Sequence, residues 1–347
     1  MSTPAFRPAW WLPGPHLPTL WGKFFRKPRD LPLRRERWDT PDDDFLDLVR
    51  LDAPASSPDA PRLVLLHGLE GGMRSHYVRG LFDQAARRGW AMDLLIFRSC
   101  GDEPNRQARL YHSGETSDAA FVLDRLHREA PARPILATGV SLGGNVLLKL
   151  LGERGPDLPA PVAAAATVSV PYDLGRGSRY ISRGFARFYE RHFLRSLRGK
   201  ALAKHERYPG IFDPARLTAA ETLWAFDDAV TAPVHGFADA DDYYTRSSSL
   251  HYLSGIRVPT LLVSAVDDPF LPPAVLDEVR EVARENAALT LDFVPRGGHV
   301  GFVGGAPWRP TYYAEDRVTN FLAAQLATAT AAPLAPQGGG GVWSPAT

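Results

Sequence analysis

Short apolar runs alternate along the chain with longer stretches in which apolar residues recur every three or four positions. The runs at 62–66, 91–97 and 162–170 are almost continuously apolar, as expected of strands that are buried on both faces of a parallel sheet. The stretches at 75–88 and 113–128 have the spacing of helices. Strands that alternate with helices predict an α/β fold with a mostly parallel, doubly wound sheet.

The alternation of strands and helices returns towards the C-terminus, and strands are also expected at the start of the domain. Two strands and two helices are expected in the C-terminal part, at 258–266, 274–285, 289–294 and 311–327. Near the start, residues 35–40 and 45–52 are expected to form an opening pair of strands, because the second of them alternates between apolar and polar positions.

The alternation of strands and helices stops between residues 172 and 256. Within this segment, residues 179–202 have the pattern of a helix with apolar residues on one side. Since the segment lies between two expected core strands, we predict that 172–256 is an inserted helical cap. The core of the domain is then formed by residues 34–171 and 257–327.

The two ends of the chain differ from the core in composition. Residues 1–33 are rich in proline and aromatic residues, and the prolines are expected to prevent regular helix. We predict an arm that wraps the domain and buries its rings. An interfacial membrane anchor is the alternative, because Arg26, Lys27 and Arg29 stand beside the aromatic residues. At the other end, the Ala/Thr/Pro run and the four consecutive glycines predict a disordered tail at 328–347.

Composition and charge limit the classes of protein to which this chain can belong. The 347 residues are 44% hydrophobic and 23% charged, which suits a globular protein with a sizeable core. A net charge of +1 gives no general attraction to nucleic acid. The alanine-rich run at 162–170 is far shorter than the ~18 residues that a membrane-spanning helix needs. We expect a cytoplasmic protein, because prolines interrupt the N-terminal region where a secretory signal would be, and the single cysteine, Cys100, excludes an internal disulfide.

A Gly-x-Ser-x-Gly motif at 139–143 carries the clearest chemical signal. It follows an apolar run and precedes an apolar helical run at 146–151, which is the strand, turn and helix of a nucleophile elbow. The strained turn would expose the Ser141 hydroxyl at the top of the sheet. Side chains in place of Gly139 and Gly143 would collide with the neighbouring helix and strand. The helix behind Ser141 points its N–H groups to where an oxyanion would form.

A serine nucleophile needs a base to take its proton and a carboxylate to orient that base. In the hydrolase fold that carries this elbow, the acid and then the histidine follow the serine along the chain. The strand at 258–266 is followed by Asp267 and Asp268. We choose Asp268, because the acid of such turns usually stands four residues before the proline that starts the next helix, here Pro272. Asp267 remains the alternative.

The base is expected to be His299, which follows the last strand in a glycine-rich loop that can bring it over the edge of the sheet. The oxyanion hole is expected to use the backbone N–H of Leu142, directly after the nucleophile. A second backbone N–H should come from Leu69, in the loop after the first buried strand. His67, at the start of that loop, is expected to be structural.

These motifs resemble those of the YheT-like branch of the α/β-hydrolases over roughly residues 10–325. The stretches that carry the resemblance, besides the elbow, are Pro15-His16-Leu17-Pro18-Thr19-Leu20, His67-Gly68-Leu69-Glu70-Gly71-Gly72, Phe97-Arg98-Ser99-Cys100 with Glu103-Pro104-Asn105-Arg106, Tyr111-His112-Ser113-Gly114-Glu115-Thr116-Ser117-Asp118, Asp267-Asp268-Pro269-Phe270 and Gly297-Gly298-His299-Val300-Gly301-Phe302. The sequence departs from the pattern at Ser99, where the branch usually has glycine, and at Pro18, where it more often has glutamine.

The resemblance implies the α/β-hydrolase fold and ester hydrolysis. Eukaryotic relatives in this branch include phospholipases that act on medium-chain phosphatidylcholines and yeast acyltransferases that make ethyl esters from medium-chain acyl-CoA. Bacterial members are mostly named as hydrolases without a known substrate. The resemblance therefore bears on the fold and the triad more than on the substrate.

The expected cap also carries a cluster of positive charge. Between residues 176 and 207 there are ten basic residues and two acidic ones, and the arginines at 179, 183, 187, 191 and 195 fall nearly four apart, on one helical face. Such a face can lie on an anionic membrane or hold a phosphate group, and no nucleic-acid recognition motif accompanies it. The simpler interpretation is a solvated face, or one that pairs with the cap's own acids, which are Asp227, Asp228, Asp239, Asp241 and Asp242.

The sequence thus predicts a serine hydrolase that cleaves short- to medium-chain carboxylic esters through Ser141, His299 and Asp268. The expected partner is a small-molecule ester or acyl substrate, held in an apolar pocket between cap and arm, and no metal or organic cofactor is expected. Three alternatives remain: an acyltransferase that transfers the acyl group to an alcohol, a phospholipase at a membrane surface, and a non-catalytic binding module. In the second, the basic cap would contact the membrane. The oligomeric state is not indicated.

Overall fold

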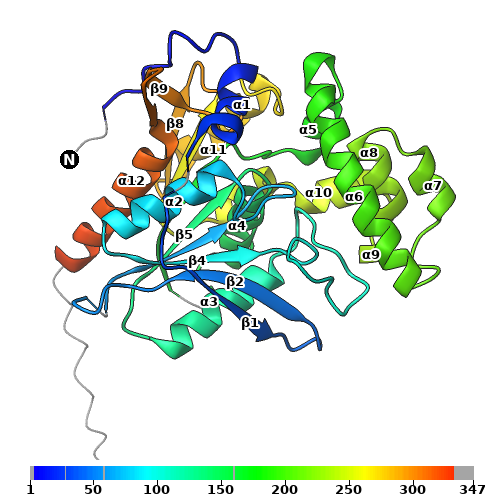
Figure 1. Ribbon diagram of the computed structural model, residues 1–347, viewed down its shortest axis with the longest axis horizontal. Helices are drawn as coiled ribbons and strands as arrows, with labels where there is room; N and C mark the ends of the chain where they lie inside the picture. The colour runs from blue at the N-terminus through cyan, green and yellow to red at the C-terminus, as the bar shows by residue number, and fades with distance from the viewer. Residues whose placement is uncertain (1–3, 28, 58, 159–160, 332–347) are drawn as a thin grey trace, which may run out of the picture.

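An eight-stranded sheet lies at the centre of the computed structural model, which describes residues 4–27, 29–57, 59–158 and 161–331 (Figure 1). The strands are ordered β1-β2-β4-β3-β5-β6-β7-β8 across the sheet. β2 runs antiparallel to both neighbours, and every pair from β4 to β8 is parallel. Their bounds are β1 Arg34–Asp39, β2 Phe45–Leu51, β3 Arg62–Leu66, β4 Ala91–Ile96, β5 Ile135–Val140, β6 Val162–Val168, β7 Thr260–Ala265 and β8 Leu289–Val294. The mostly parallel, doubly wound sheet predicted from the sequence is confirmed.

Helices cover both faces of this sheet. One face packs against α2 (His76–Arg87) and α12 (Tyr313–Ala331), and the other against α3 (Ser117–Glu129), α4 (Leu142–Arg154) and α11 (Pro273–Glu285). Alternate residues of β3 point to opposite faces, so that Leu63 and Leu65 belong to the first layer and Val64 and Leu66 to the second. Burial on both faces explains why this strand is apolar at consecutive positions.

The segment between β6 and β7 forms helices and turns that lie to one side of the sheet (Figure 1). Its elements are α5 (Leu174–Ile181), the 3-10 turn η1 (Gly184–Ala186), α6 (Arg187–Arg207), α7 (Pro214–Ala219), α8 (Leu223–Phe226), the π-helix η2 (Asp227–Thr231), α9 (Ala232–His235), α10 (Ala240–Ser247) and the 3-10 segment η3 (Ser249–Gly255). The segment has an apolar cluster of its own, which includes Leu194, Leu197 and Phe226. We propose that residues 172–256 act as a cap over the core, as the sequence suggested.

The single helix predicted at 179–202 is wrong, because the structure divides that stretch. α5 ends at Ile181, and the next helix, α6, begins only at Arg187. Gly184 lies between them with a positive φ of 52°, a conformation that glycine adopts without strain and that no helix continues through. The periodicity of the arginines runs across this break, so the sequence pattern alone did not reveal it.

The prediction that prolines prevent helix in the N-terminal arm is also wrong. The arm contains α1 (His16–Phe25), with Pro15 at its N-cap and Pro18 in its first turn. The first backbone N–H groups of a helix have no partner within the helix, so proline there removes no hydrogen bond. The arm buries only part of its aromatic surface, since Trp11 and Trp21 pack edge to face while Phe24 and Phe25 stay exposed.

Two features near the C-terminus also differ from the prediction. A hairpin of β9 (Val303–Ala306) and β10 (Arg309–Tyr312) lies between the last strand of the main sheet and the last helix. The helix expected at 311–327 therefore begins at Tyr313, and it continues to Ala331. The first four residues of the expected disordered tail are thus helical, and the rest of that tail, 332–347, lies outside the described residues.

Candidate active site

Ser141 lies at the sharp turn between β5 and α4. Its backbone has a φ of 52° and a ψ of −121°, and its N–H donates to the Val168 carbonyl at 2.8 Å. A Cβ at Gly143 would lie 2.3 Å from the Leu66 carbonyl oxygen, and one at Gly139 would lie 2.4 Å from the Gly143 carbonyl oxygen. Only glycine therefore permits this approach of strand, turn and helix, as the elbow motif predicts.

The structure brings the three predicted side chains into one hydrogen-bonded chain. His299 Nε2 lies 3.0 Å from Ser141 Oγ, and His299 Nδ1 lies 2.9 Å and 3.2 Å from the two carboxylate oxygens of Asp268. Because a carboxylate only accepts, Nδ1 carries the proton and Nε2 is free to accept the serine proton. The ring of Phe270 stacks on the imidazole at 4.0 Å between centroids, which limits access of water from that side.

Asp267, the alternative acid, has a different set of partners. One of its carboxylate oxygens accepts the backbone N–H groups of Gly297 and Gly298, at 2.8 Å and 2.9 Å. These two residues lead directly into His299. Asp267 thus shapes the loop that carries the histidine, whereas Asp268 contacts the histidine ring itself.

The N-terminal arm supplies a contact that the sequence reasoning missed. The backbone N–H of His299 donates to Thr19 Oγ1 at 2.9 Å, and the Thr19 hydroxyl donates to the Pro15 carbonyl at 2.7 Å. Gly298 lies so close to the arm that a Cβ there would be 2.3 Å from the Pro15 carbonyl oxygen. The sequence indicates the Pro15–Leu20 motif only through a family resemblance, and its contacts fix the histidine loop from outside the core.

Replacing Thr19 with valine is expected to lower kcat on a soluble ester by about tenfold, because the histidine loop loses one of its anchors and the imidazole is held less firmly. The measurement is steady-state kinetics of purified wild type and variant, with thermal unfolding as a check of folding. Thr19→Ser keeps the hydroxyl and should retain most of the activity. Equal kcat values for the valine variant and wild type would contradict this role.

The two backbone amides proposed for an oxyanion hole have no acceptor among the described residues. The N–H groups of Leu69 and Leu142 make no hydrogen bond there, and both residues line the cavity beside Ser141. The neighbours of Leu69 are anchored, since Gly68 N–H donates to the Tyr77 hydroxyl at 2.8 Å and Glu70 N–H donates to the Tyr111 hydroxyl at 2.9 Å. The loop thus holds one amide free between two that are fixed, which suits an oxyanion hole.

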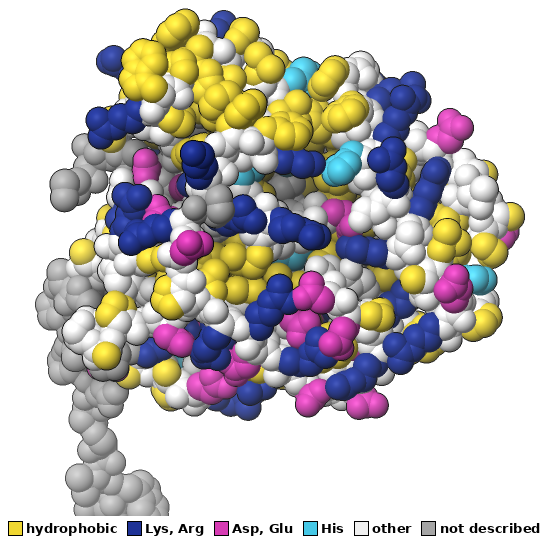
Figure 2. All heavy atoms as spheres, in the orientation of Figure 1, with side chains coloured by type: hydrophobic (Ala, Val, Ile, Leu, Met, Phe, Trp, Pro, Cys, Tyr) yellow, Lys and Arg dark blue, Asp and Glu magenta, His cyan; other side chains and the backbone are white. Residues whose placement is uncertain are grey.

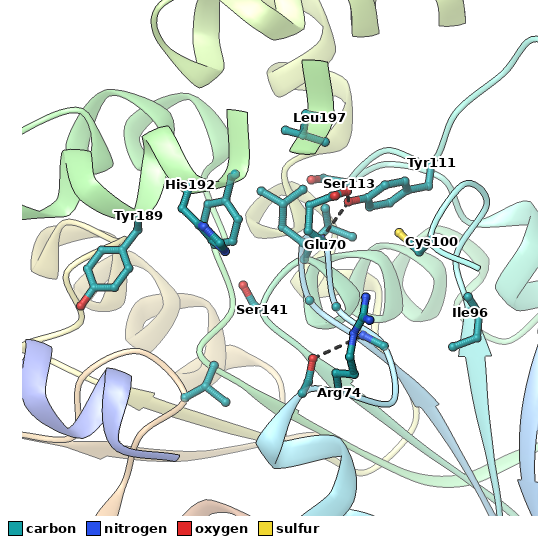
Figure 3. Close-up of a pocket in the computed structure, with 18 of the residues that line it drawn as sticks. Glu70, Arg74, Ile96, Cys100, Tyr111, Ser113, Ser141, Tyr189, His192 and Leu197 are labelled. Carbon is teal, nitrogen blue, oxygen red and sulfur yellow. Dashed lines mark hydrogen bonds between the residues drawn. The ribbon is translucent and has the colours of Figure 1, made fainter. Parts of the chain in front are cut away.

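Glu70 ties this loop to the cap, a connection that no sequence motif indicated. Its carboxylate accepts from the Tyr111 hydroxyl at 2.7 Å (Figure 3). It also accepts from Lys200 Nζ at 2.7 Å and from the Ser196 hydroxyl. Lys200 and Ser196 belong to α6 of the cap. Because Glu70 directly follows Leu69, the position of α6 and the position of the free amide are mechanically linked.

His67 has the structural role expected of it. Its side chain is buried, its Nε2 accepts the Phe97 backbone N–H at 3.2 Å, and its Nδ1 therefore donates to the Gly68 carbonyl at 2.7 Å. Burial lowers the pKa of His67 to about 4, so the ring stays neutral at physiological pH. It supports the turn that carries Leu69.

A cavity of about 950 Å³ opens onto Ser141 and His299. Side chains from the arm, the core loops and the cap line it together, and Figure 3 shows His192 of α6 above Ser141 and Tyr189 of the same helix to the left. The apolar part of the wall includes Leu20, Phe188 and Leu197. This volume is large enough for a ligand of drug-like size with an apolar chain.

The fold and the nucleophile elbow are those of an α/β-hydrolase, and comparison with known proteins supports this class. Residues 61–306 match the family model described as the alpha/beta hydrolase fold. The chain is 40% identical over 313 residues to a protein of Escherichia coli (strain K12) named "Putative esterase YheT", covering 90% of this chain and 91% of that protein. It is 28% identical over 267 residues to the phospholipase ABHD3 of Bos taurus, covering 77% of this chain and 64% of the relative.

Among solved structures, an esterase of Pyrococcus furiosus, Pf2001, superimposes with a TM-score of 0.57 at 16% identity, over 86% of this chain and 92% of that one. At this identity the likeness shows the fold alone. The chain belongs to the α/β-hydrolase family and is an ester hydrolase of the esterase and lipase type. Within that family, it is a member of the YheT-like branch.

Proposed function

We propose that Ser141, His299 and Asp268 form a catalytic triad that cleaves carboxylic esters through an acyl-enzyme. The hydrogen-bonded chain from Ser141 Oγ to the Asp268 carboxylate is the observation that carries the proposal. His299 takes the proton of Ser141 as the hydroxyl attacks the acyl carbonyl, and Asp268 keeps the imidazole in the tautomer that can accept it. The backbone N–H groups of Leu69 and Leu142 stabilise the oxyanion.

The second half of the reaction uses the same groups in reverse. The imidazolium of His299 protonates the leaving alkoxide, which departs as the alcohol and leaves the acyl group on Ser141. Water then takes the place of the alcohol, gives its proton to His299 and attacks the acyl-enzyme. Collapse of the second tetrahedral intermediate releases the carboxylic acid and returns the proton to Ser141.

The cavity suggests esters of short- to medium-chain acids as substrates. Its apolar wall next to Ser141 can accept an acyl chain, and its limited volume sets an upper bound on the chain length that fits. A series of p-nitrophenyl esters should therefore show an optimum at short or medium chains, with turnover falling for long ones. A rate that is independent of chain length would contradict an acyl pocket of defined depth.

Acyl transfer to an alcohol would use the same acyl-enzyme, with an alcohol in the place of water. The two reactions are separated by analysing the products when ethanol is added to the ester assay. Free acid as the only product at high ethanol concentration excludes the transferase, whereas ethyl ester as the main product supports it. The cytoplasmic location expected from the sequence stays a prediction.

A further inference from the structure

Two short segments hold most of the exposed apolar side chains of the described residues. Five of the eight large apolar side chains that are exposed lie on α1 or at the junction of η1 and α6, and they are between 47% and 66% exposed. These five are Leu17, Phe24, Phe25, Phe185 and Phe188. Figure 2 shows apolar side chains gathered at the top of the view, over α1 in Figure 1. A contiguous exposed patch of this kind marks an interaction site.

The two segments form one surface, which borders the mouth of the cavity. The ring centroids of His16 and Phe185 lie 4.5 Å apart, and His16 Nδ1 lies 3.2 Å from the Tyr189 hydroxyl. Phe24 and Phe188, although largely exposed, also line the cavity that contains Ser141. Whatever covers this surface therefore faces the entrance to the candidate active site.

Arginines without partners flank the apolar surface. Arg183, Arg187, Arg191 and Arg195 are exposed, and none of their guanidinium groups has a hydrogen bond or an acidic partner among the described residues. The nearby Glu190 is only 1% exposed, and its carboxylate accepts from the Ser182 hydroxyl and the Leu223 backbone N–H.

The five arginines at 179, 183, 187, 191 and 195 lie on α5, on α6 and between the two helices, and of these only Arg179 pairs with an acid of the cap, Asp241 at 2.7 Å. Asp228 and Asp242 bind other arginines, Arg216 and Arg246. The sequence analysis expected a solvated face or one paired with the cap's own acids. Pairing is found for Arg179, and the other four arginines are exposed to solvent. Four positive charges remain available to an external anion.

We propose that α1 and the start of α6 dock on an anionic phospholipid bilayer, which places the mouth of the cavity against the lipid. Aromatic side chains that enter the interface, together with arginines that meet lipid phosphates, are the features of a protein that lies on a membrane. None of the described helices is both long and apolar enough to cross a bilayer, so the contact is peripheral. The proposal rests on the proposed function and assigns its substrates to esters that reach the enzyme from a lipid surface.

A second copy of this chain fits the surface less well. In a twofold dimer the same patch faces itself, so the four unpaired arginines of one copy would approach those of the other. Like charges without intervening acids repel each other, whereas a bilayer with anionic headgroups supplies the opposite charge. Charge complementarity thus favours lipid over self-association.

The test uses the full chain and flotation with two kinds of vesicle, pure phosphatidylcholine and phosphatidylcholine with about one-third phosphatidylglycerol. Wild type should bind the anionic vesicles more strongly than the neutral ones, and added salt should weaken the binding. The double variants Phe25→Ser/Phe185→Ser and Arg187→Glu/Arg191→Glu should each bind at least about tenfold more weakly. All four positions lie outside the cavity wall, so turnover of a soluble p-nitrophenyl ester should stay unchanged.

Matched controls separate this surface from general effects of charge and hydrophobicity. Arg125→Glu/Arg128→Glu reverses two charges on α3, which lies at the opposite end of the molecule from α1 in Figure 1, and Leu202→Ser removes an exposed apolar side chain further along α6. Both controls should bind vesicles like wild type. Unchanged vesicle binding by the two test variants overturns the proposal, and so does a wild type that binds neither kind of vesicle.

Light scattering on the wild type and on Phe25→Ser/Phe185→Ser tests whether the surface mediates self-association instead. A dimer that becomes a monomer in this variant, without vesicle binding by wild type, would assign the surface to self-association and overturn the lipid proposal. Soluble-ester turnover is a separate readout. If it is absent in wild type, the proposed function fails, and if it persists while vesicle binding fails, only the docking surface is lost.

Discussion

Replacing Ser141 with alanine is expected to lower kcat/KM on a soluble p-nitrophenyl ester by at least about 10³-fold. The variant loses the nucleophile, so no acyl-enzyme can form, and only the oxyanion hole and the binding of substrate remain to assist water. The measurement is turnover of purified wild type and variant, together with covalent labelling by a fluorophosphonate probe, which reacts with an activated serine.

The fold should survive this substitution. Among the residues that the structure describes, the Ser141 side chain bonds only to His299, and its strained backbone conformation is no worse for alanine than for serine. Wild type should therefore label while Ser141→Ala does not, at equal melting temperature. Labelling of the alanine variant to the same extent would show that another nucleophile reacts, and an unlabelled wild type would remove the main support for the triad.

The core of the fold was predictable because the sequence patterns that specify its strands and the elbow are local. β3 has the same bounds in the sequence analysis and in the structure, since a strand buried on both faces must be apolar at nearly every position. The bounds of β8 also agree, although this strand lies at the edge of the sheet and its central residues are only partly buried. The elbow was predictable for a related reason. Its two glycines are required by contacts within a few residues and with one neighbouring strand.

The parts that escaped prediction depend on contacts between distant segments. Thr19 meets His299 across 280 residues of chain, and Glu70 meets Lys200 across 130. Neither residue type signals its role, because a threonine in an arm and a glutamate in a loop are ordinary surface residues. The helix in the arm was missed for another reason, as proline breaks a helix only after its first turn.

The choice between the two adjacent aspartates could be argued from sequence only through the distance to Pro272. The structure separates them by their partners, because Asp268 Oδ2 lies 2.9 Å from the histidine ring, whereas Asp267 accepts two backbone amides of the loop. These partners imply different consequences for loss of charge. The carboxylate of Asp268 fixes the tautomer of the His299 imidazole, and the carboxylate of Asp267 fixes the backbone of the loop that leads into His299.

Replacing Asp268 with asparagine is expected to lower kcat at neutral pH by about 10³- to 10⁴-fold, because the amide can donate to Nδ1 and so favour the tautomer that leaves Nε2 protonated. Asp267→Asn keeps an oxygen that can accept from Gly297 and Gly298, so its loss in kcat should be about tenfold or less, accompanied by a lower melting temperature. Steady-state kinetics of both variants between neutral and alkaline pH, with thermal unfolding in parallel, distinguishes the two roles. If Asp267→Asn suffers the larger loss in kcat while Asp268→Asn retains activity, the acid of the triad is Asp267, and the hydrogen bond seen between Asp268 and His299 serves only to position the ring.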